Sequence, residues 1–391
     1  TDEAEDPTPI LTTDHSDLRS AIESAAEGDT VVVDTDHTLS RHINLPSNIT
    51  LSGGGGTVRL KDESASGTML RLENVENVRI DGLHLDGNRR HQTNAGGGLI
   101  GGLRLGTVSN VRITNCVIEN AYSNGIMFGD KTPGEGRFTD IYIANNRVMN
   151  CHRHGIIMGV KNAPGSIQNV LIEGNDVQEF DKAIGITVYG VNGVDVNSVA
   201  IIGNSCENTG GSSNGTAIAF EEQVHNCIAY ANSVDMWGPG SVNGIVSTKD
   251  AHHCIIGNNR VRNCRDGLGV MNFPYYQPEG PPKWNLVTHN DVQNCRSGFA
   301  YRNLEGELTV YRNYLANNRI DINNQGNNSG DAYYFSSNGS DISSESVGLP
   351  ETLGSSVTYV GPDGGDLGWA EWSRGSISSK TPVSVEVHTT E

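Results

Sequence analysis

One short motif recurs along most of this 391-residue chain and limits how it can fold. Each copy sets alternating apolar residues on both sides of an asparagine, as in "IYIANNRVMNC" and "CIIGNNRVRNC". Most copies lie about thirty residues apart, a period typical of stacked repeats. The repeated asparagines are Asn115, Asn146, Asn175, Asn204, Asn232, Asn259, Asn290 and Asn313.

Each repeat predicts three short strands. Two flank the asparagine, and a third follows at a glycine-hydrophobic step such as "NGIMF", "HGIIM" or "SGFAY". Helical repeats are excluded because Gly, Asn and β-branched residues interrupt every helix-length segment. We therefore predict an all-β fold, a right-handed single-stranded parallel β-helix, whose asparagines form a ladder between coils.

The ends of the chain depart from the repeat. Residues 1–30 form an N-terminal arm and a short amphipathic helix, "SDLRSAIESAAEGDT", which begins at a Ser16 or Asp17 cap and covers the open end of the stack. Residues 31–325 are the parallel β-helix. Residues 326–391 contain strand-like pieces, and the sequence leaves open whether they form a C-terminal cap or a small β appendage.

The alternation also predicts which side chains face inward. One inward row consists of Ile113, Ile143, Ile172, Ile201, Ile256, Val287 and Val310. The neighbouring positions give an outer stripe that is too apolar for open water, formed by Tyr142, Leu171, Ala200, Ile228, Ile255, Leu286 and Thr309. We expect another element or another subunit to cover this stripe.

The seven cysteines follow the same register, and none lies in a C-x-x-C spacing. Cys151, Cys264 and Cys295 share one coil position, and Cys227 and Cys254 share another. Stacked pairs could be oxidised, but buried thiols in a core are the favoured interpretation.

The charge narrows the range of partners. The formal net charge of −19 repels nucleic acids and anionic lipids and suits a high-salt environment. We found no apolar run long enough to span a bilayer.

The asparagine repeat, the glycine-hydrophobic steps, the N-terminal helix and the opening "ITLSGGGGTV" resemble the pectin-lyase-like superfamily of right-handed parallel β-helix proteins over roughly residues 15–325. The resemblance implies a protein that handles polysaccharide, as lyases, polygalacturonases, epimerases and viral tailspikes of this type do. It carries no mechanism, because the paired aspartates and Gly-His-Gly motif of polygalacturonases are missing. The calcium-binding carboxylates and catalytic arginine of pectate lyases have no clear match either.

Loops inserted after the glycine-hydrophobic strands predict the wall of a glycan-binding groove. The candidate catalytic carboxylates are Glu221, Glu222, Asp250 and Asp181. The candidate substrate-binding residues are Arg153, His154, Lys182, Tyr189, Lys249, Tyr275, Tyr276, Trp284 and Arg302. The cluster His152–His154 reads as a charged turn, and neither it nor His252–His253 has a known zinc-ligand spacing.

Three functions are compatible with these residues: a polysaccharide lyase, hydrolase or epimerase, a glycan-binding tailspike or adhesin, and a structural surface rod. We expect an extracellular, cell-surface or virion protein that binds a polysaccharide or surface glycan, does not insert into membranes and forms a homo-oligomer, with a trimer favoured. We expect no cofactor and no metal site, with calcium as the one ion left open.

Overall fold

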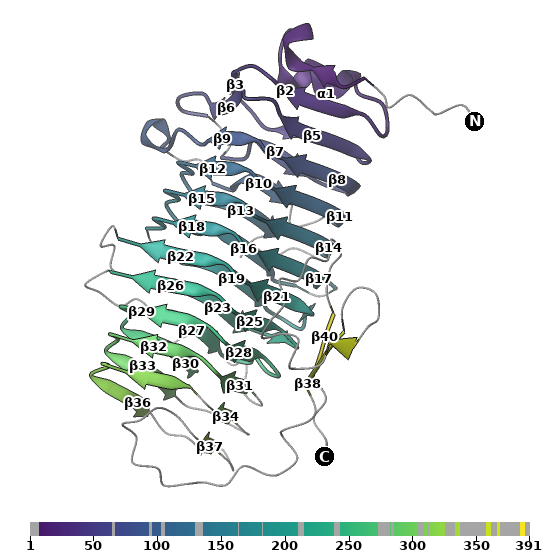
Figure 1. The fold of residues 1–391 in the computed structure, drawn as a ribbon. Coiled ribbons are helices and arrows are strands. Elements are labelled where there is room, and N and C mark those ends of the chain that lie inside the picture. The colour runs from purple at the N-terminus through teal and green to yellow at the C-terminus, as the bar shows by residue number, and fades with distance from the viewer. Residues whose placement is uncertain are drawn as a thin grey trace.

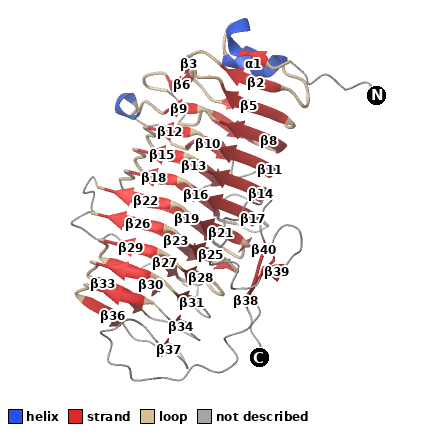
Figure 2. Cartoon of the chain, in the orientation of Figure 1, coloured by secondary structure: helices blue, strands red, loops and turns tan. Residues whose placement is uncertain are grey.

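The chain was analysed as a computed structural model. The described residues are 8–324 except 65–66, 94–95, 103–105, 130–135, 163, 182, 210–214, 238–242, 273–281, 283–284, 303–307 and 312, together with four later strands. Three parallel sheets wind along one axis, and successive coils pass from sheet A to sheet B to sheet C (Figures 1 and 2). The architecture is the predicted right-handed parallel β-helix.

The strands of the three sheets follow the sequence repeat. Sheet A contains β1 (Ile10–Leu11), β2 (Thr30–Val33), β5 (Ile49–Gly53), β8 (Val75–Asp81), β11 (Thr107–Thr114), β14 (Arg137–Ala144), β17 (Ser166–Glu173), β21 (Val199–Ile202), β25 (Ile228–Tyr230), β28 (Ile255–Gly257), β31 (Asn285–Thr288), β34 (Leu308–Tyr311) and β37 (Tyr333–Ser336), with β20 (Asp195–Asn197) and β24 (Val224–His225) at its side. Sheet B contains β3 (His37–Leu39), β6 (Thr57–Leu60), β9 (His84–Asp86), β12 (Val117–Glu119), β15 (Arg147–Met149), β18 (Asp176–Gln178), β22 (Ser205–Asn208), β26 (Ser233–Met236), β29 (Arg260–Arg262), β32 (Asp291–Gln293) and β35 (Tyr314–Ala316). Sheet C contains β4 (Ile43–Asn44), β7 (Leu70–Leu72), β10 (Gly98–Gly102), β13 (Asn124–Gly129), β16 (Ile156–Val160), β19 (Ile184–Gly190), β23 (Thr216–Glu222), β27 (Asn243–Thr248), β30 (Asp266–Met271), β33 (Ser297–Arg302) and β36 (Ile320–Asn324).

The predicted N-terminal helix is α1 (Leu18–Ser24), which follows a short 3-10 helix, η1 (Thr12–Asp14). The Asp17 carboxylate caps α1 by accepting from the Ser20 backbone N–H at 2.8 Å. Leu18, Ala21 and Ile22 are buried, and α1 lies at the end of the stack beside β2 (Figure 1). The helix therefore covers core side chains that the first coil would otherwise expose.

The predicted inward row is confirmed. Every one of its members is buried, and the register pairs Ile113 with Ile143, Ile172 and Ile201 on successive strands. The outer stripe is also largely buried within a single chain: Leu171, Ala200, Ile228 and Ile255 belong to one apolar cluster, and each is at most 1% exposed. A second subunit is thus not required to remove the stripe from water.

The last three described strands form a sheet of their own. Strands β38 (Val357–Val360), β39 (Asp366–Leu367) and β40 (Ser384–Val387) make a small antiparallel sheet, whereas β37 still pairs with β34 in the solenoid. Strand β40 lies next to β21 of sheet A (Figure 1).

The asparagine ladder runs unbroken from Asn146 to Asn313. At each rung the side-chain oxygen accepts from the backbone and side-chain N–H groups of the asparagine one coil earlier, at 2.8–3.1 Å. The amide nitrogen of Asn204, for example, also donates to the Ile172 carbonyl at 2.9 Å. Each rung satisfies backbone groups that the turn between sheets A and B leaves without a strand partner.

The placement of Asn115 in the ladder was wrong. Asn115 has a φ of 55° and precedes the ladder position, which Cys116 occupies. Later coils carry Asn145 or Gly174 at the same left-handed position. The turn therefore needs one residue that tolerates a positive φ, followed directly by the residue that forms the ladder. Because asparagine satisfies both demands, the sequence alone did not separate them.

Replacing Cys116 by asparagine is expected to raise the free energy of unfolding by about 1 kcal/mol. The Cys116 thiol lies 3.9 Å from the Ile80 carbonyl, which is too far for a strong hydrogen bond, whereas an amide nitrogen would donate to that oxygen as Asn146 donates to Ile113. Urea unfolding of C116N, with C116S as the control that lacks the amide, measures the gain. A midpoint for C116N no higher than that of C116S would contradict the extra rung.

All seven cysteines are buried and free, which confirms the interpretation as core thiols. Burial raises the pKa of the Cys116 and Cys151 thiols to about 12. These cysteines therefore act as small apolar residues rather than as metal ligands or nucleophiles.

Candidate functional site

The outer face of sheet C brings together several of the predicted site residues. Tyr189, Glu221, Thr248, Met271 and Arg302 occupy one register position on five consecutive strands. The Glu221 carboxylate is half-buried and accepts from the Thr187 hydroxyl at 3.3 Å. Glu221 pairs with Thr248, which directly precedes Lys249 and Asp250. This register agrees with the prediction that Glu221 stacks close to those two residues.

The structure pairs Glu222, the last residue of β23, with Lys249, which follows β27 one coil later. Glu222 and Lys249 have φ values of 69° and 55°, and their side chains form an ion pair that is largely buried. The ammonium group neutralises the carboxylate, and the turn holds both groups in place. Glu222 is therefore an ion-pair partner of Lys249, and its role as a general acid or base stays a prediction.

Two predicted glycan contacts are in fact buried. Tyr189 is only 1% exposed because its ring lies against Gly159, where any Cβ would overlap the ring. His154 is 5% exposed, and its Nδ1 lies 2.9 Å from the Asn124 side-chain oxygen. Neither offers an open surface to a sugar, because packing between neighbouring coils takes up the face that sequence reasoning assigned to ligand.

The remaining substrate-binding predictions divide into three groups. Arg153 is exposed in the turn before β16, and Arg302 is half-buried at the end of β33. Lys182, Tyr275, Tyr276 and Trp284 lie outside the described residues.

Asp181 lies apart from the other predicted carboxylates. It precedes β19, whereas Glu221 aligns with the far end of that strand. Asp181 forms an ion pair with Arg89 and lies 3.5 Å from His152 Nδ1. The structure thus joins Asp181 to an arginine ninety-two positions earlier in the chain, rather than to Glu221.

Arg89 belongs to a pocket that sequence reasoning missed, on the sheet B side of the first coils. The pocket has a volume of about 330 Å³ and is lined by Arg59, Asp86, Asn88, Arg89, Arg90, His91, Asn120 and Asn150. Strands β6 and β9 supply Arg59 and Asp86, and the 3-10 helix η2 (Arg89–His91) supplies three further side chains. We call this cavity the arginine pocket.

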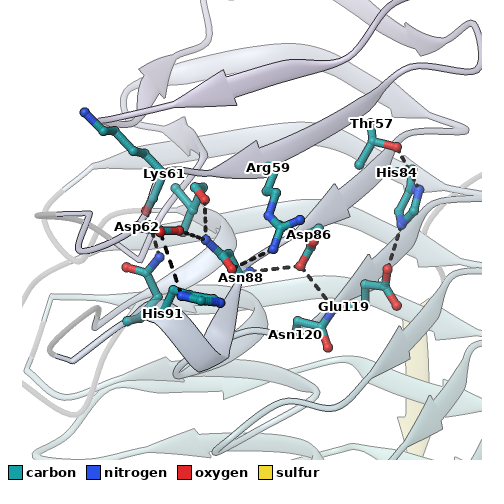
Figure 3. Close-up of polar contacts among 12 residues, drawn as sticks. Thr57, Arg59, Lys61, Asp62, His84, Asp86, Asn88, His91, Glu119 and Asn120 are labelled. Atoms are coloured by element: carbon teal, nitrogen blue, oxygen red, sulfur yellow. Dashed lines mark hydrogen bonds and ion pairs between the residues drawn. The ribbon is translucent and has the colours of Figure 1, made fainter.

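A hydrogen-bonded network fixes the floor of the arginine pocket (Figure 3). Asn88 has a φ of 51°, and its amide nitrogen donates to the Leu60 carbonyl at 3.0 Å and to Asp62 at 2.8 Å. The Asn88 side-chain oxygen accepts from Arg59 Nη2 at 2.8 Å. Asp86 accepts from Asn120 at 3.0 Å. Because the asparagine side chains are held from several coils, the pocket is formed without a ligand.

The guanidinium groups differ in what they contact. Arg59 lies 3.5 Å from Asp86, while Arg89 donates to Asn150 Oδ1 at 3.0 Å and His152 Nδ1 at 3.1 Å in addition to contacting Asp181. Arg90 is exposed and makes no ion pair within the described part of the chain. Three guanidiniums therefore lie beside two carboxylates, Asp86 in the lining and Asp181 next to Arg89. Among the described residues, the positive charge of Arg90 is left without an ion pair, in a chain whose net charge is −19.

The sequence held one signal for this pocket. The run "GNRRHQ" places two arginines and a histidine in a single turn of an acidic chain. The first coils lack the ladder asparagine, so the repeat register did not extend to this turn. Arg59, Asn120 and Asn150 could therefore not be assigned to it.

Two further features bear on function. Within the described ranges, no three His, Cys, Asp or Glu side chains group closely enough to hold a metal ion. None of the described helices is both long and apolar enough to cross a membrane.

Comparison with known proteins supports the fold. The sequence matches no protein-family model and no curated protein. The structure is similar to a hyperthermoactive exopolygalacturonase from Thermotoga maritima, with a TM-score of 0.61, 13% identity and coverage of 83% of this chain and 91% of that one. It is similar to the catalytic unit of a GH87 α-1,3-glucanase from Streptomyces thermodiastaticus, with a TM-score of 0.56, 14% identity and coverage of 87% and 71%.

A third similar structure is not described as an enzyme. The surface adhesin PfbA of Streptococcus pneumoniae has a TM-score of 0.50 and 13% identity, with coverage of 91% of this chain and 97% of that one. At such identities the likeness extends to the fold and not to the chemistry. The chain thus shares the right-handed parallel β-helix fold of these proteins.

Proposed function

We propose that this protein is an extracellular or surface-exposed protein that binds an acidic polysaccharide through the arginine pocket. The observation that carries the proposal is the set of three guanidiniums, Arg59, Arg89 and Arg90, which line one preformed cavity in an acidic chain. A guanidinium presents a planar fork of donors that matches a carboxylate or sulfate group. Asn120 and Asn150 belong to the same lining, and their amides hydrogen-bond to each other, to Asp86 and to Arg89, which holds the guanidinium of Arg89 in place.

Recognition is better supported than cleavage. A glycosidase needs two carboxyl groups that flank one scissile bond. Of the four predicted catalytic residues, Glu222 contacts Lys249 and Asp181 contacts Arg89. Cleavage or epimerisation by this chain therefore remains a hypothesis, for which Glu221, Glu222, Asp250 and Asp181 are the predicted residues.

The proposed surface location is consistent with the proteins that share the fold, which include an adhesin and polysaccharide-degrading enzymes. The trimer, the high-salt habitat and the virion location remain predictions. The outer stripe no longer argues for a trimer, because one chain buries most of it.

Replacing Arg90 by glutamine is expected to weaken binding of a polyuronate by about tenfold, since one charge-assisted hydrogen bond contributes about 1.5–3 kcal/mol. Calorimetric titration of galacturonate oligomers at two salt concentrations measures the change, with a neutral glucan oligomer as the ligand control. Arg137→Gln removes an equally exposed cation from sheet A and should leave the affinity unchanged. Equal binding of the neutral and acidic oligomers, or equal affinity of R90Q and the parent protein, would refute the proposal.

A further inference from the structure

A second cationic cluster lies far from the arginine pocket, on the same corner of the solenoid. The turns from sheet B to sheet C place Arg265, Arg296 and Arg319 on three consecutive coils. Their register is fixed by backbone hydrogen bonds, since Ser297 N–H donates to the Arg265 carbonyl at 2.7 Å and Ile320 N–H donates to the Arg296 carbonyl at 2.9 Å. We call these three residues, together with Trp237, the corner row.

The arginines of the corner row stack at about 4.8 Å per coil, which costs electrostatic free energy through like-charge repulsion. Only Arg265 is compensated, because it donates to the buried Asp266 at 2.8 Å and to Asn243 at 2.7 Å. Arg296 and Arg319 are exposed and form no ion pair with any residue in the described ranges. An exposed row of positive charges is suited to a polymer whose negative charges recur along its length.

An aromatic side chain extends the row toward the N-terminus. Trp237 follows β26, one coil before the turn that carries Arg265, and its side chain is 62% exposed. Its backbone N–H is fixed to the Asn208 carbonyl at 3.0 Å. An exposed indole face offers a stacking surface for the apolar face of a sugar ring, next to cations that would bind the acidic groups.

We propose that the corner row is a second binding site for an acidic polysaccharide chain, and that one chain spans the row and the arginine pocket. The inference rests on the proposed function of the pocket. In sheet B the strands that precede the corner row, β26 to β35, are five to eight steps from β9, so the row begins about 24 Å from the pocket along the axis and ends about 38 Å from it. Arg153 and His152 lie in turns of the same corner between them. A polymer that follows this corner would cross the coils in order.

A polysaccharide fits this surface better than a nucleic acid does. Double-stranded DNA carries one charge per about 1.7 Å, and a chain of net charge −19 repels so dense a polyanion over its whole length. A polyuronate carries about one charge per sugar, so local attraction by a few arginines can exceed the general repulsion. The spacing of the arginines by whole coils is compatible with charges that recur at intervals.

Two linked sites predict that affinity depends on polymer length. A short galacturonate oligomer reaches only one cluster, whereas a long polymer that reaches both is expected to bind about a hundredfold more tightly. The double variant Arg296→Gln/Arg319→Gln should lose at least about tenfold of the affinity for the long polymer and keep the affinity for a short oligomer in the pocket. Trp237→Ala should likewise lower the affinity for the long polymer and leave the affinity for the short oligomer unchanged. The matched control is Arg41→Gln/Arg137→Gln, which removes two exposed cations elsewhere and should change neither affinity.

The outcomes separate the two proposals. If Arg90→Gln weakens both ligands while the Arg296/Arg319 variant binds the long polymer like the parent protein, the corner row is not a site and the pocket stands. If neither set of variants changes any affinity, the pocket proposal fails as well. A sulfated glycan tested beside the polyuronate tells which acidic group is preferred. Tighter binding of single-stranded DNA of matched length through the same arginines would overturn the assignment to polysaccharide.

Discussion

Replacing Asn204 by alanine is expected to lower the free energy of unfolding by about 3–5 kcal/mol, because a buried donor without a partner costs about 1–3 kcal/mol. The substitution removes the acceptor for two N–H groups of Asn175, both at 2.9 Å, and the donor to the Ile172 carbonyl. Asn204 lies in the middle of the ladder, so the loss weakens the interface between neighbouring coils, on which the stability of a solenoid depends. Urea unfolding followed by circular dichroism measures the change.

Two companion variants make the test specific. Asn197→Ala removes a half-buried asparagine outside the ladder and should cost less than about 1 kcal/mol. In Asn204→Asp, a buried carboxylate would face the Ile172 carbonyl, so the folded protein favours the protonated acid and the pKa of this carboxyl is raised above its unfolded value. The destabilisation of N204D relative to the parent protein is therefore expected to be smallest at mildly acidic pH. It should grow as the pH rises through the folded pKa. A loss for N204A no greater than that for N197A would contradict the structural role of the ladder.

Replacing Arg89 by alanine is expected to reduce both stability and binding. The Arg89 side chain is 21% exposed and contacts Asn150, His152 and Asp181, so its removal leaves a carboxylate and an amide oxygen without their donor. We expect a loss of about 2–3 kcal/mol in the free energy of unfolding and a loss of more than tenfold in affinity for a polyuronate. Thermal unfolding and calorimetric titration of one preparation measure both.

A lysine at position 89 separates charge from geometry. Arg89→Lys keeps the charge but cannot donate to three partners from a planar fork, so it should recover only part of either loss. Arg59→Ala is the comparison for a more exposed guanidinium: Arg59 is 52% exposed, lies 3.5 Å from Asp86 and donates to Asn88 at 2.8 Å, so its loss should cost less stability than the loss of Arg89. Full recovery by lysine would show that Arg89 acts through its charge alone.

The sequence was sufficient for the fold because one pattern repeats. In a solenoid each coil contacts mainly its neighbours, so a motif that recurs about every thirty residues fixes strand order and register together. The inward row beginning at Ile113 and Ile143 was predicted correctly for this reason. The error at Asn115 arose where two adjacent residues share one preference, and only the coil geometry distinguished the ladder position from the left-handed turn.

The candidate site was predicted only in part. Register placed Glu221 and Lys249 on adjacent coils, because the repeat determines which residues stack. Register does not determine whether an outward side chain meets water or a neighbouring side chain. Tyr189 lies against Gly159 and Glu222 pairs with Lys249, and both facts depend on side-chain packing that a periodic pattern does not encode.

By itself the sequence determined the coil, the ladder, the inward row, the capping helix and the buried thiols, because each follows from local periodicity or from the preferences of single residues. The tertiary structure alone decided the arginine pocket. Arg59 and Arg89 are separated by about one full coil, and Arg89 and Asp181 by about three, so their contacts depend on the number of residues in the intervening turns. Turn lengths vary from coil to coil, and the position of a side chain on the surface depends on all the turns that precede it in the stack.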